Sequence, residues 1–224
     1  MKREFLTTGD GSVTIHIPDW DEQYHSKNGA IQEAQHVFIQ TGLRYFCGIS
    51  EIRELTILEI GFGTGLNAFL TQLEATALNI NVNYNGIEAY PVSEEEVKAL
   101  NYAQLLGLAN TSFLKLHEVP WEAKASITKN FSLEKQEKFF KDISEKNKYH
   151  LVYFDAFGAR VQPELWTEAI FKRMFMALKE GGVLVTYAAK GSVRRAMQAV
   201  GFAVERLPGP PGKREMLRAT KPSS

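Results

Sequence analysis

The sequence has very little cysteine: Cys47 is the single one among 224 residues. No disulfide can therefore form within the chain, and a metal site built on cysteine is not expected. No apolar run approaches the roughly 18 residues that a membrane span needs. The first four residues also lack the apolar stretch of a secretion signal. These absences predict a cytoplasmic protein that does not enter a membrane.

Histidine is scarce as well, with five in the chain. His25 and His36 belong to a polar segment that runs from Tyr24 to Gly29 and continues past Glu33. No acid cluster stands at a spacing that would complete a metal site with these histidines. The sequence therefore predicts no bound metal.

Net charge is absent too, because 26 basic residues balance 26 acidic ones. The balance is uneven, since the segment from Lys190 to the end holds eight basic and two acidic residues. A basic segment on a neutral protein can face a polyanion, although charge alone favours a simple solvated surface. The residues predicted to contact the phosphates of a nucleic acid are Lys190, Arg194, Arg195, Lys213 and Arg214.

The chain does contain 44% apolar residues, enough for a packed globule, in segments that alternate between strand and helix patterns. The alternation predicts one α/β domain with a doubly wound, mostly parallel sheet of seven strands, the last of them antiparallel. The predicted strands are Leu55–Glu59, Val82–Ile87, Phe131–Lys135, Leu151–Phe154, Val183–Tyr187, Phe202–Arg206 and Arg214–Thr220. The predicted helices are Asn67–Thr76, Glu94–Leu106, Lys138–Lys146, Glu164–Leu178 and Val193–Val200.

Two further features complete the predicted organisation. Residues 1–50 form an N-terminal extension of unassigned structure that is expected to contribute to the site, and residues 51–224 form a Rossmann-like core. One helix start is well marked, because Ser93 and Glu96 stand three residues apart as in a capping box.

The segment from Leu55 to Asn67 carries the strongest functional signal. It is a short apolar strand that ends in an acid, Glu59, followed by three glycines at alternate positions and a helix start. Glycines let the backbone turn tightly and approach a ligand, and a helix start offers unpaired N–H groups. Leu66 stands where the dinucleotide pattern Gly-x-Gly-x-x-Gly has its third glycine, so S-adenosylmethionine is favoured over NAD. The three glycines are Gly61, Gly63 and Gly65.

Two acids end later strands and are expected at the same edge of the sheet, where ligands of open α/β sheets bind. Glu88 can accept hydrogen bonds from the ribose hydroxyls of an adenosine, with an exposed strand-end acid as the alternative. Asp155, with Phe157 two residues later, suits methyl transfer to an amine, with a helix-capping role as the alternative. The carboxylate can align the amine, and the ring can lie against a cationic centre.

Four stretches of the chain resemble the methyltransferase domain of the MnmC family of tRNA-modification enzymes. They are Tyr24–Ser26 with Asn28-Gly29 and His36–Phe38; Glu59–Asn67; Phe154–Phe157 with Pro163–Thr167; and Val193–Arg195 with Gly201-Phe202 and Lys213–Leu217. The sequence departs from the family around Asp155 and Phe157, because Ala156 stands between them and Gly158-Ala159 follows them. No acid in Glu134–Lys138 can be matched to the family's adenine-side acid.

The resemblance implies a class I fold with S-adenosylmethionine as methyl donor. It implies N-methylation of aminomethyl-(2-thio)uridine at the wobble position of tRNA, with Asp155 as the catalytic aspartate. It also implies a stand-alone form without the family's fused flavin oxidase. The candidate cofactor-binding residues are Tyr24, Glu59, Gly61, Phe62, Gly63, Gly65, Asn67, Glu88, Asp155 and Phe157.

Three alternatives stay open at this point. A methyltransferase for a small-molecule amine would use the same fold and loop but would have no use for Lys213 and Arg214. A non-catalytic RNA-binding module would bind tRNA without binding S-adenosylmethionine. An NAD oxidoreductase is the weakest option, because Leu66 interrupts its motif.

Overall fold

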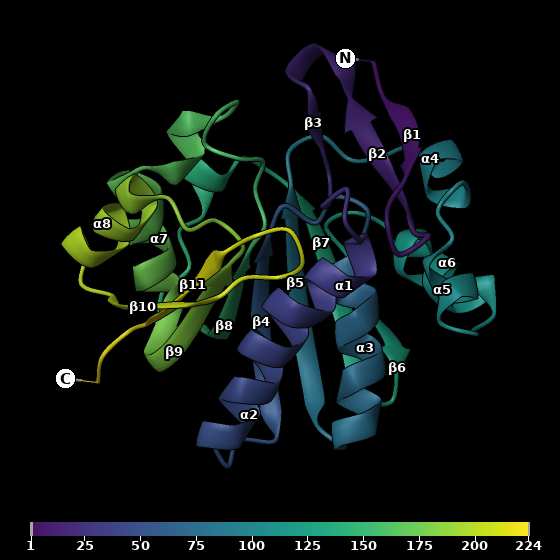
Figure 1. Cartoon of the computed structure of the whole chain (residues 1–224). Helices are drawn as coiled ribbons and strands as arrows, with labels where there is room; N and C mark the ends of the chain where they lie inside the picture. Colours follow the sequence, from purple (N-terminus) through teal and green to yellow (C-terminus); the bar gives the residue numbers. More distant parts are fainter. Residues whose placement is uncertain (1, 224) are drawn as a thin grey trace.

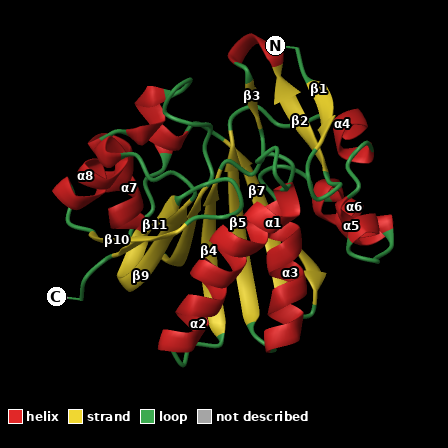
Figure 2. Ribbon diagram, in the orientation of Figure 1, coloured by secondary structure: helices red, strands yellow, loops and turns green. Residues whose placement is uncertain are grey.

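The computed structural model describes residues 2–223 and contains an eight-stranded sheet with helices on both faces (Figure 1, Figure 2). The strand order is β10-β11-β9-β8-β4-β5-β7-β6. The five central strands, from β9 to β7, are parallel, whereas β11 runs antiparallel to β9 and β10. The strands are β4 (Glu54–Ile60), β5 (Asn81–Glu88), β6 (Lys124–Thr128), β7 (Phe131–Glu137), β8 (Tyr149–Phe154), β9 (Leu178–Thr186), β10 (Ala203–Pro208) and β11 (Glu215–Thr220).

All seven predicted strands are present, and the last is antiparallel as expected. The eighth strand, β6, is an antiparallel edge strand that the sequence did not indicate. Its two apolar residues, Ala125 and Ile127, are only partly buried, so the apolar signal of this strand is weak.

The connection between β5 and β8 differs most from expectation. The predicted helix over Lys138–Lys146 is wrong, because only a single 3₁₀ turn, η3 (Phe140–Asp142), forms there. Phe140 and Ile143 instead anchor the segment in the core. An unpredicted helix, α6 (Asn110–Glu118), precedes β6, and the predicted helix over Glu94–Leu106 is split in two. The two pieces are α4 (Glu94–Lys98), which begins with the expected Ser93 capping box, and α5 (Tyr102–Leu105).

The N-terminal extension has its own structure. It forms a small antiparallel sheet of β1 (Glu4–Thr7), β2 (Val13–Ile17) and β3 (Glu22–Gln23), with a 3₁₀ turn, η1 (Pro18–Trp20). The chain then runs as one continuous helix through α1 (Ala30–Ala34), the π-helical η2 (Gln35–Arg44) and α2 (Tyr45–Ile49). Figure 1 shows the small sheet beyond the upper ends of the central strands.

Two buried clusters, one on each face of the sheet, hold the layers together. On one face Phe38 of η2 and Phe69 of α3 (Leu66–Leu78) pack on the central strands. On the other face Phe171 of α7 (Glu168–Ala177) and Met197 of α8 (Gly191–Ala199) do the same. A 3₁₀ turn, η4 (Pro163–Trp166), precedes α7. Within residues 2–223, no helix has the length and apolar character needed to span a membrane.

Candidate active site

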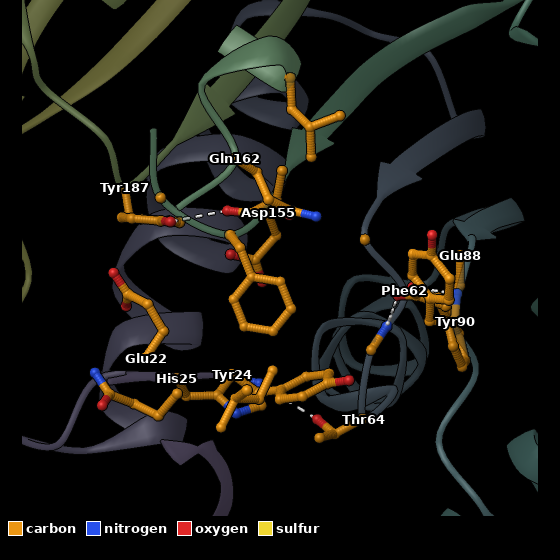
Figure 3. Close-up of a pocket in the computed structure, with 18 of the residues that line it drawn as sticks. Glu22, Tyr24, His25, Phe62, Thr64, Glu88, Tyr90, Asp155, Gln162 and Tyr187 are labelled. Atoms are coloured by element: carbon orange, nitrogen blue, oxygen red, sulfur yellow. Dashed lines mark hydrogen bonds between the residues drawn. The ribbon is translucent and has the colours of Figure 1, made fainter. Parts of the chain in front are cut away.

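A cavity of about 1290 Å³ lies at the carboxyl ends of the parallel strands, where open α/β sheets bind ligands (Figure 3). Its walls come from the turn after β4, the end of β5 and the segment after β8. The N-terminal extension closes the remaining side with residues from Trp20 to Asn28. Residues of the N-terminal extension are therefore part of the cavity wall.

The turn after β4 wraps back against the neighbouring strands. The backbone N–H groups of Gly61 and Phe62 both donate to the carbonyl of Ile87 at the end of β5, over 3.0 and 2.9 Å. Gly61 has a φ of +88°, and a Cβ atom there would lie 2.6 Å from the carbonyl oxygen of Asp155. Only glycine fits a left-handed backbone pressed against another main chain, so the motif fixes the cavity floor.

Glu88 links the end of β5 to this glycine turn. Its Oε2 accepts from the N–H of Gly63 at 3.0 Å, and its Oε1 accepts from the N–H groups of Ala89 and Tyr90, both at 3.0 Å. Three backbone donors hold the carboxylate in one orientation at the cavity wall. Its remaining lone pairs are available to hydroxyl groups of a ligand.

Asp155 occupies the cavity floor beside the same turn. The side-chain amide of Asn67 donates 2.8 Å hydrogen bonds to Asp155 Oδ2 and to Glu59 Oε1. The pKa of Asp155 is raised to about 7, chiefly by burial and then by the nearby charge of Glu33, while Asn67 and Lys213 act in the opposite direction. A carboxyl group with this pKa can take up and release a proton near neutral pH.

Glu59 lies behind this arrangement and not in the cavity wall. Its side chain is fully buried, and burial raises its pKa well above the usual value. It holds Asn67 from behind. Within the described chain, Glu59 Oε2 and Asn67 Oδ1 have no hydrogen-bond partner. Since Asn67 lines the cavity and Glu59 does not, Asn67 Oδ1 is the acceptor that leaves the floor able to receive a donor group such as an amine.

Aromatic rings from the N-terminal extension and from the segment after β8 form another part of the wall. Phe157 packs edge-on against Tyr24 and Trp20, with ring centroids 4.9 and 5.5 Å apart. The carbonyl of Phe157 accepts a 2.8 Å hydrogen bond from the indole N–H of Trp166, which fixes the segment after β8. Flat apolar rings beside a carboxylate suit a planar ligand that carries a cationic group.

Most of the sequence-predicted residues line the cavity, and the rest lie elsewhere in the described chain. Those in the wall are Tyr24, Gly61, Phe62, Gly63, Asn67, Glu88, Asp155, Phe157 and Lys213. Glu59 and Gly65 support the turn from outside the cavity. The basic residues Lys190, Arg194, Arg195 and Arg214 are not part of its wall; Arg194 is half-buried and the other three are exposed. Sequence reasoning missed several wall residues, namely Glu22, Glu33, Gln162 and Tyr187. Only Glu33 carried a signal, as part of the polar segment after Tyr24.

Residues 110–222 match a protein family described as S-adenosyl-L-methionine-dependent methyltransferase. The chain belongs to this family. The family's dependence on S-adenosylmethionine agrees with the cavity, whose glycine turn, strand-end acid Glu88 and unpartnered Asn67 Oδ1 fit such a nucleoside. The sequence-based prediction of a methyltransferase with an antiparallel last strand is confirmed.

Individual proteins similar to this chain point to one group of methyltransferases. The methyltransferase is 27% identical over 227 residues to the tRNA 5-methylaminomethyl-2-thiouridine biosynthesis bifunctional protein MnmC of Actinobacillus pleuropneumoniae, and 30% identical over 233 residues to that of Cupriavidus metallidurans. These alignments cover 91% and 96% of this chain but 33% of each relative, so the chain spans about one third of their length. A crystal structure of MNMC2 from Aquifex aeolicus matches with a TM-score of 0.81 and 27% identity, covering 100% of this chain and 71% of that one. The resemblance to the MnmC methyltransferase domain is thereby confirmed.

The half-buried His117, whose ring contacts the carbonyl of Thr64 in the glycine turn, predicts a pH effect on the free energy of unfolding. Burial and then the charge of Lys135 lower its pKa from 6.5 to about 4, so the unfolded chain binds the proton more readily. The contribution of neutral His117 to the free energy of unfolding is therefore fully present above pH 6.5 and is lost as the pH falls toward 4. Relative to H117Q, the wild type should therefore lose about 2 kcal/mol of unfolding free energy between pH 7.5 and pH 5. Urea unfolding of both proteins measures the difference, and a pH-independent difference would contradict the prediction.

Proposed function

We propose that this methyltransferase transfers the methyl group of S-adenosylmethionine to the primary amine of aminomethyl-(2-thio)uridine at the wobble position of tRNA. The product is methylaminomethyl-(2-thio)uridine. The observation that carries the proposal is the position of Asp155 on the floor of the cavity beside the glycine turn, where Asn67 holds its carboxylate and burial raises its pKa to about 7. The printed names of the MnmC relatives, which concern 5-methylaminomethyl-2-thiouridine in tRNA, support the choice of substrate.

The donor is assigned to the half of the cavity between β4 and β5. Glu88 is proposed to bind the ribose hydroxyls, and the turn from Gly61 to Gly63 to approach the nucleoside closely. Asn67, whose Oδ1 is unpartnered within the described chain, is proposed to bind the amino-acid portion. The adenine is assigned to the wall made by Tyr90, by Glu137 at the end of β7 and by Phe139 after it.

The acceptor amine is assigned to the other half, between Asp155 and the aromatic wall. The donor supplies an electrophilic methyl group on a sulfonium centre. An alkylammonium ion has no lone pair to attack it, so the amine must lose its proton in the cavity. Asp155 can take that proton because its own pKa is near 7, and the same carboxylate aligns the nitrogen. Since the reaction moves a charge without creating one, orientation can supply much of the acceleration.

The tRNA is proposed to lie along the basic side of the cavity mouth. Tyr187 in the cavity wall is followed three residues later by Lys190, where α8 begins. Lys190 and Arg195 are exposed, as is Arg214 in the turn before β11. Contacts of this kind neutralise phosphates and position the RNA without reading its sequence.

The variant K190E/R195E is expected to raise KM for tRNA about tenfold or more and to leave S-adenosylmethionine affinity unchanged. Each phosphate contact removed should also reduce the slope of log affinity against log salt by about 1. The matched control is K129E, because Lys129 is exposed in the β6–β7 turn at the opposite edge of the sheet. Equal losses in both variants would show that this surface is not the tRNA site.

The proposed function is tested by incubating the protein with labelled S-adenosylmethionine and tRNA that carries aminomethyl-uridine. Mass analysis of the wobble nucleoside should show the labelled methylaminomethyl product. Labelling of a small amine but never of tRNA would favour the small-molecule alternative. Binding of tRNA without any affinity for S-adenosylmethionine would favour an RNA-binding module.

A further inference from the structure

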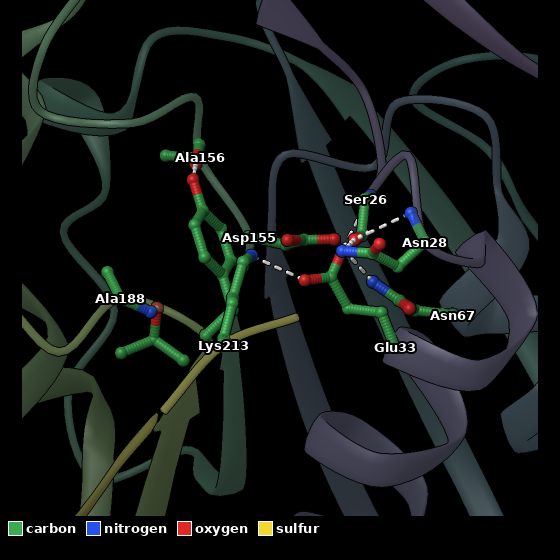
Figure 4. A network of polar contacts seen from close by, with 10 residues as sticks. Ser26, Asn28, Glu33, Asn67, Asp155, Ala156, Ala188 and Lys213 are labelled. Atoms are coloured by element: carbon green, nitrogen blue, oxygen red, sulfur yellow. Dashed lines mark hydrogen bonds and ion pairs between the residues drawn. The ribbon is translucent and has the colours of Figure 1, made fainter. Parts of the chain in front are cut away.

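Lys213 does not point to solvent as a phosphate contact would. It sits in the turn between β10 and β11, and its ammonium group forms an ion pair with Glu33 of α1 (Figure 4). The same Nζ lies 3.8 Å from the centroid of the Tyr187 ring, which favours a cation over its face. The side chains of Lys213 and Glu33 are 31% and 9% exposed, so the pair is largely shielded from water.

Both partners of Lys213 are themselves held in place. Glu33 Oε2 accepts a 2.8 Å hydrogen bond from the N–H of Ser26, and the Tyr187 hydroxyl donates at 2.8 Å to the carbonyl of Ala156. Ala156 directly follows Asp155. The arrangement therefore brings α1, the segment after β9 and the β10–β11 turn together on the side of the cavity next to Asp155 (Figure 4).

We propose that Lys213 is a positioning residue of the transfer site, which neutralises Glu33 and leaves Asp155 as the carboxyl group that receives the proton of the amine. The proposal rests on the proposed function and assigns a role to a residue outside the glycine turn and the strand ends. It replaces the phosphate contact that the sequence predicted for Lys213.

The charges around Asp155 give the physical reason. Asp155 and Glu33 lie close enough to repel each other, and Lys213 attracts both. The other titratable groups that interact with Asp155 are Glu59, Tyr84 and Tyr187. Among the ion pairs of residues 2–223, none includes Asp155. Without Lys213, two unneutralised carboxylates would share the cavity and hold the amine as its ammonium ion.

Removing Lys213 and removing Glu33 should shift the pKa of Asp155 in opposite directions. Removing the cation in K213M should raise the pKa of Asp155, whereas removing the anion in E33Q should lower it. The double variant K213M/E33Q should return it close to the wild-type value. K213R keeps the charge and is the matched control. A purely structural role would make both single variants less stable without moving the titration in opposite directions.

The experiment follows the carboxyl carbon resonance of Asp155 by ¹³C NMR through a pH titration of the free protein. The D155N variant identifies the resonance. We expect midpoints displaced by at least about half a pH unit, upward in K213M and downward in E33Q. Displacements in the same direction, or an unmoved midpoint in E33Q, would overturn the proposal even if K213M does not fold.

The same variants separate this inference from the proposed function. The acidic limb of kcat/KM for tRNA should follow the midpoints seen by NMR. Because the titration uses neither donor nor tRNA, it reads the charge relation directly. Opposite NMR shifts without tRNA methylation would reject the substrate and keep the charge relation. Methylation with unmoved midpoints would reject the role of Lys213 alone.

Discussion

Replacing Asp155 with asparagine is expected to lower kcat for methyl transfer by about 100-fold to 10,000-fold. This is the range that a positioned general base contributes. Asparagine keeps the size of the side chain and can still accept the hydrogen bond from Asn67, but it cannot take a proton. The acidic limb near pH 7 should disappear from the rate profile, and what activity remains should rise with the fraction of neutral amine. Steady-state rates of tRNA methylation from pH 6 to pH 9 measure both effects.

The fold of D155N should be intact and, at high pH, more stable than the wild type. The pKa of Asp155 is raised from 3.8 to about 7, so the folded state favours the protonated form. The contribution of protonated Asp155 to the free energy of unfolding is fully present below pH 3.8 and is lost as the pH rises through 7. At pH 8 the folded wild type therefore carries an unfavourable charge on Asp155. Asparagine carries no such charge, so D155N should gain on the order of 1 kcal/mol there, because the cavity screens part of the effect.

The matched control is D142N, since Asp142 is exposed in η3. It should change neither the rate nor its pH profile. Near wild-type turnover by D155N with an unaltered profile would show that Asp155 does not handle the proton. Loss of folding in D155N but not in D142N would contradict the predicted gain in stability.

Replacing Gly61 with alanine is expected to abolish measurable binding of S-adenosylmethionine and to destabilise the protein. The φ of +88° costs an L-residue about 1–2 kcal/mol, and the new Cβ would lie 2.6 Å from the Asp155 carbonyl oxygen. Neither atom belongs to a flexible side chain, so the turn and the segment after β8 must separate. A displaced floor moves both the donor site and Asp155, and each 1.4 kcal/mol lost in binding lowers affinity tenfold.

Isothermal titration with S-adenosylmethionine and thermal unfolding test G61A directly. The matched control is G48A in α2, because no described atom lies within 4 Å of a Cβ at Gly48 and its φ is not positive. Alanine is the better helix former, so G48A should bind the donor normally and be equally or slightly more stable. Wild-type affinity in G61A would contradict the assignment of this turn to the donor.

The residues at the carboxyl ends of the strands could be predicted, because the order of strands and helices along the chain is enough to place them. In a parallel sheet the carboxyl ends of the strands share one edge, so Glu88 and Asp155 had to lie near the glycine turn. Their spacing in sequence was irrelevant once the strands were recognised. The same reasoning placed Glu59 among the cofactor-binding residues. Its side chain instead points into the core from inside β4 and reaches the cavity only through Asn67.

The acceptor side could not be predicted in the same way. Glu33, Tyr187 and Lys213 come from three distant segments, and their contacts depend on tertiary packing that no local pattern encodes. The N-terminal sheet was also hidden, since β3 has two residues, too few for a recognisable alternation. Lys213 belongs to one of the stretches that resemble the MnmC family, but the sequence does not indicate whether its side chain faces the cavity or the solvent.

The central claim concerns the position of the reacting groups, and a crystal structure of the protein with S-adenosylmethionine tests it most directly. We predict that the nucleoside lies against Gly61 and Glu88 with the sulfonium methyl group directed toward Asp155. An amine nitrogen should then fit between the methyl carbon and the carboxylate, about 3 Å from each. A methionine portion directed elsewhere, or a methyl group with Asp155 out of its reach, would contradict the account.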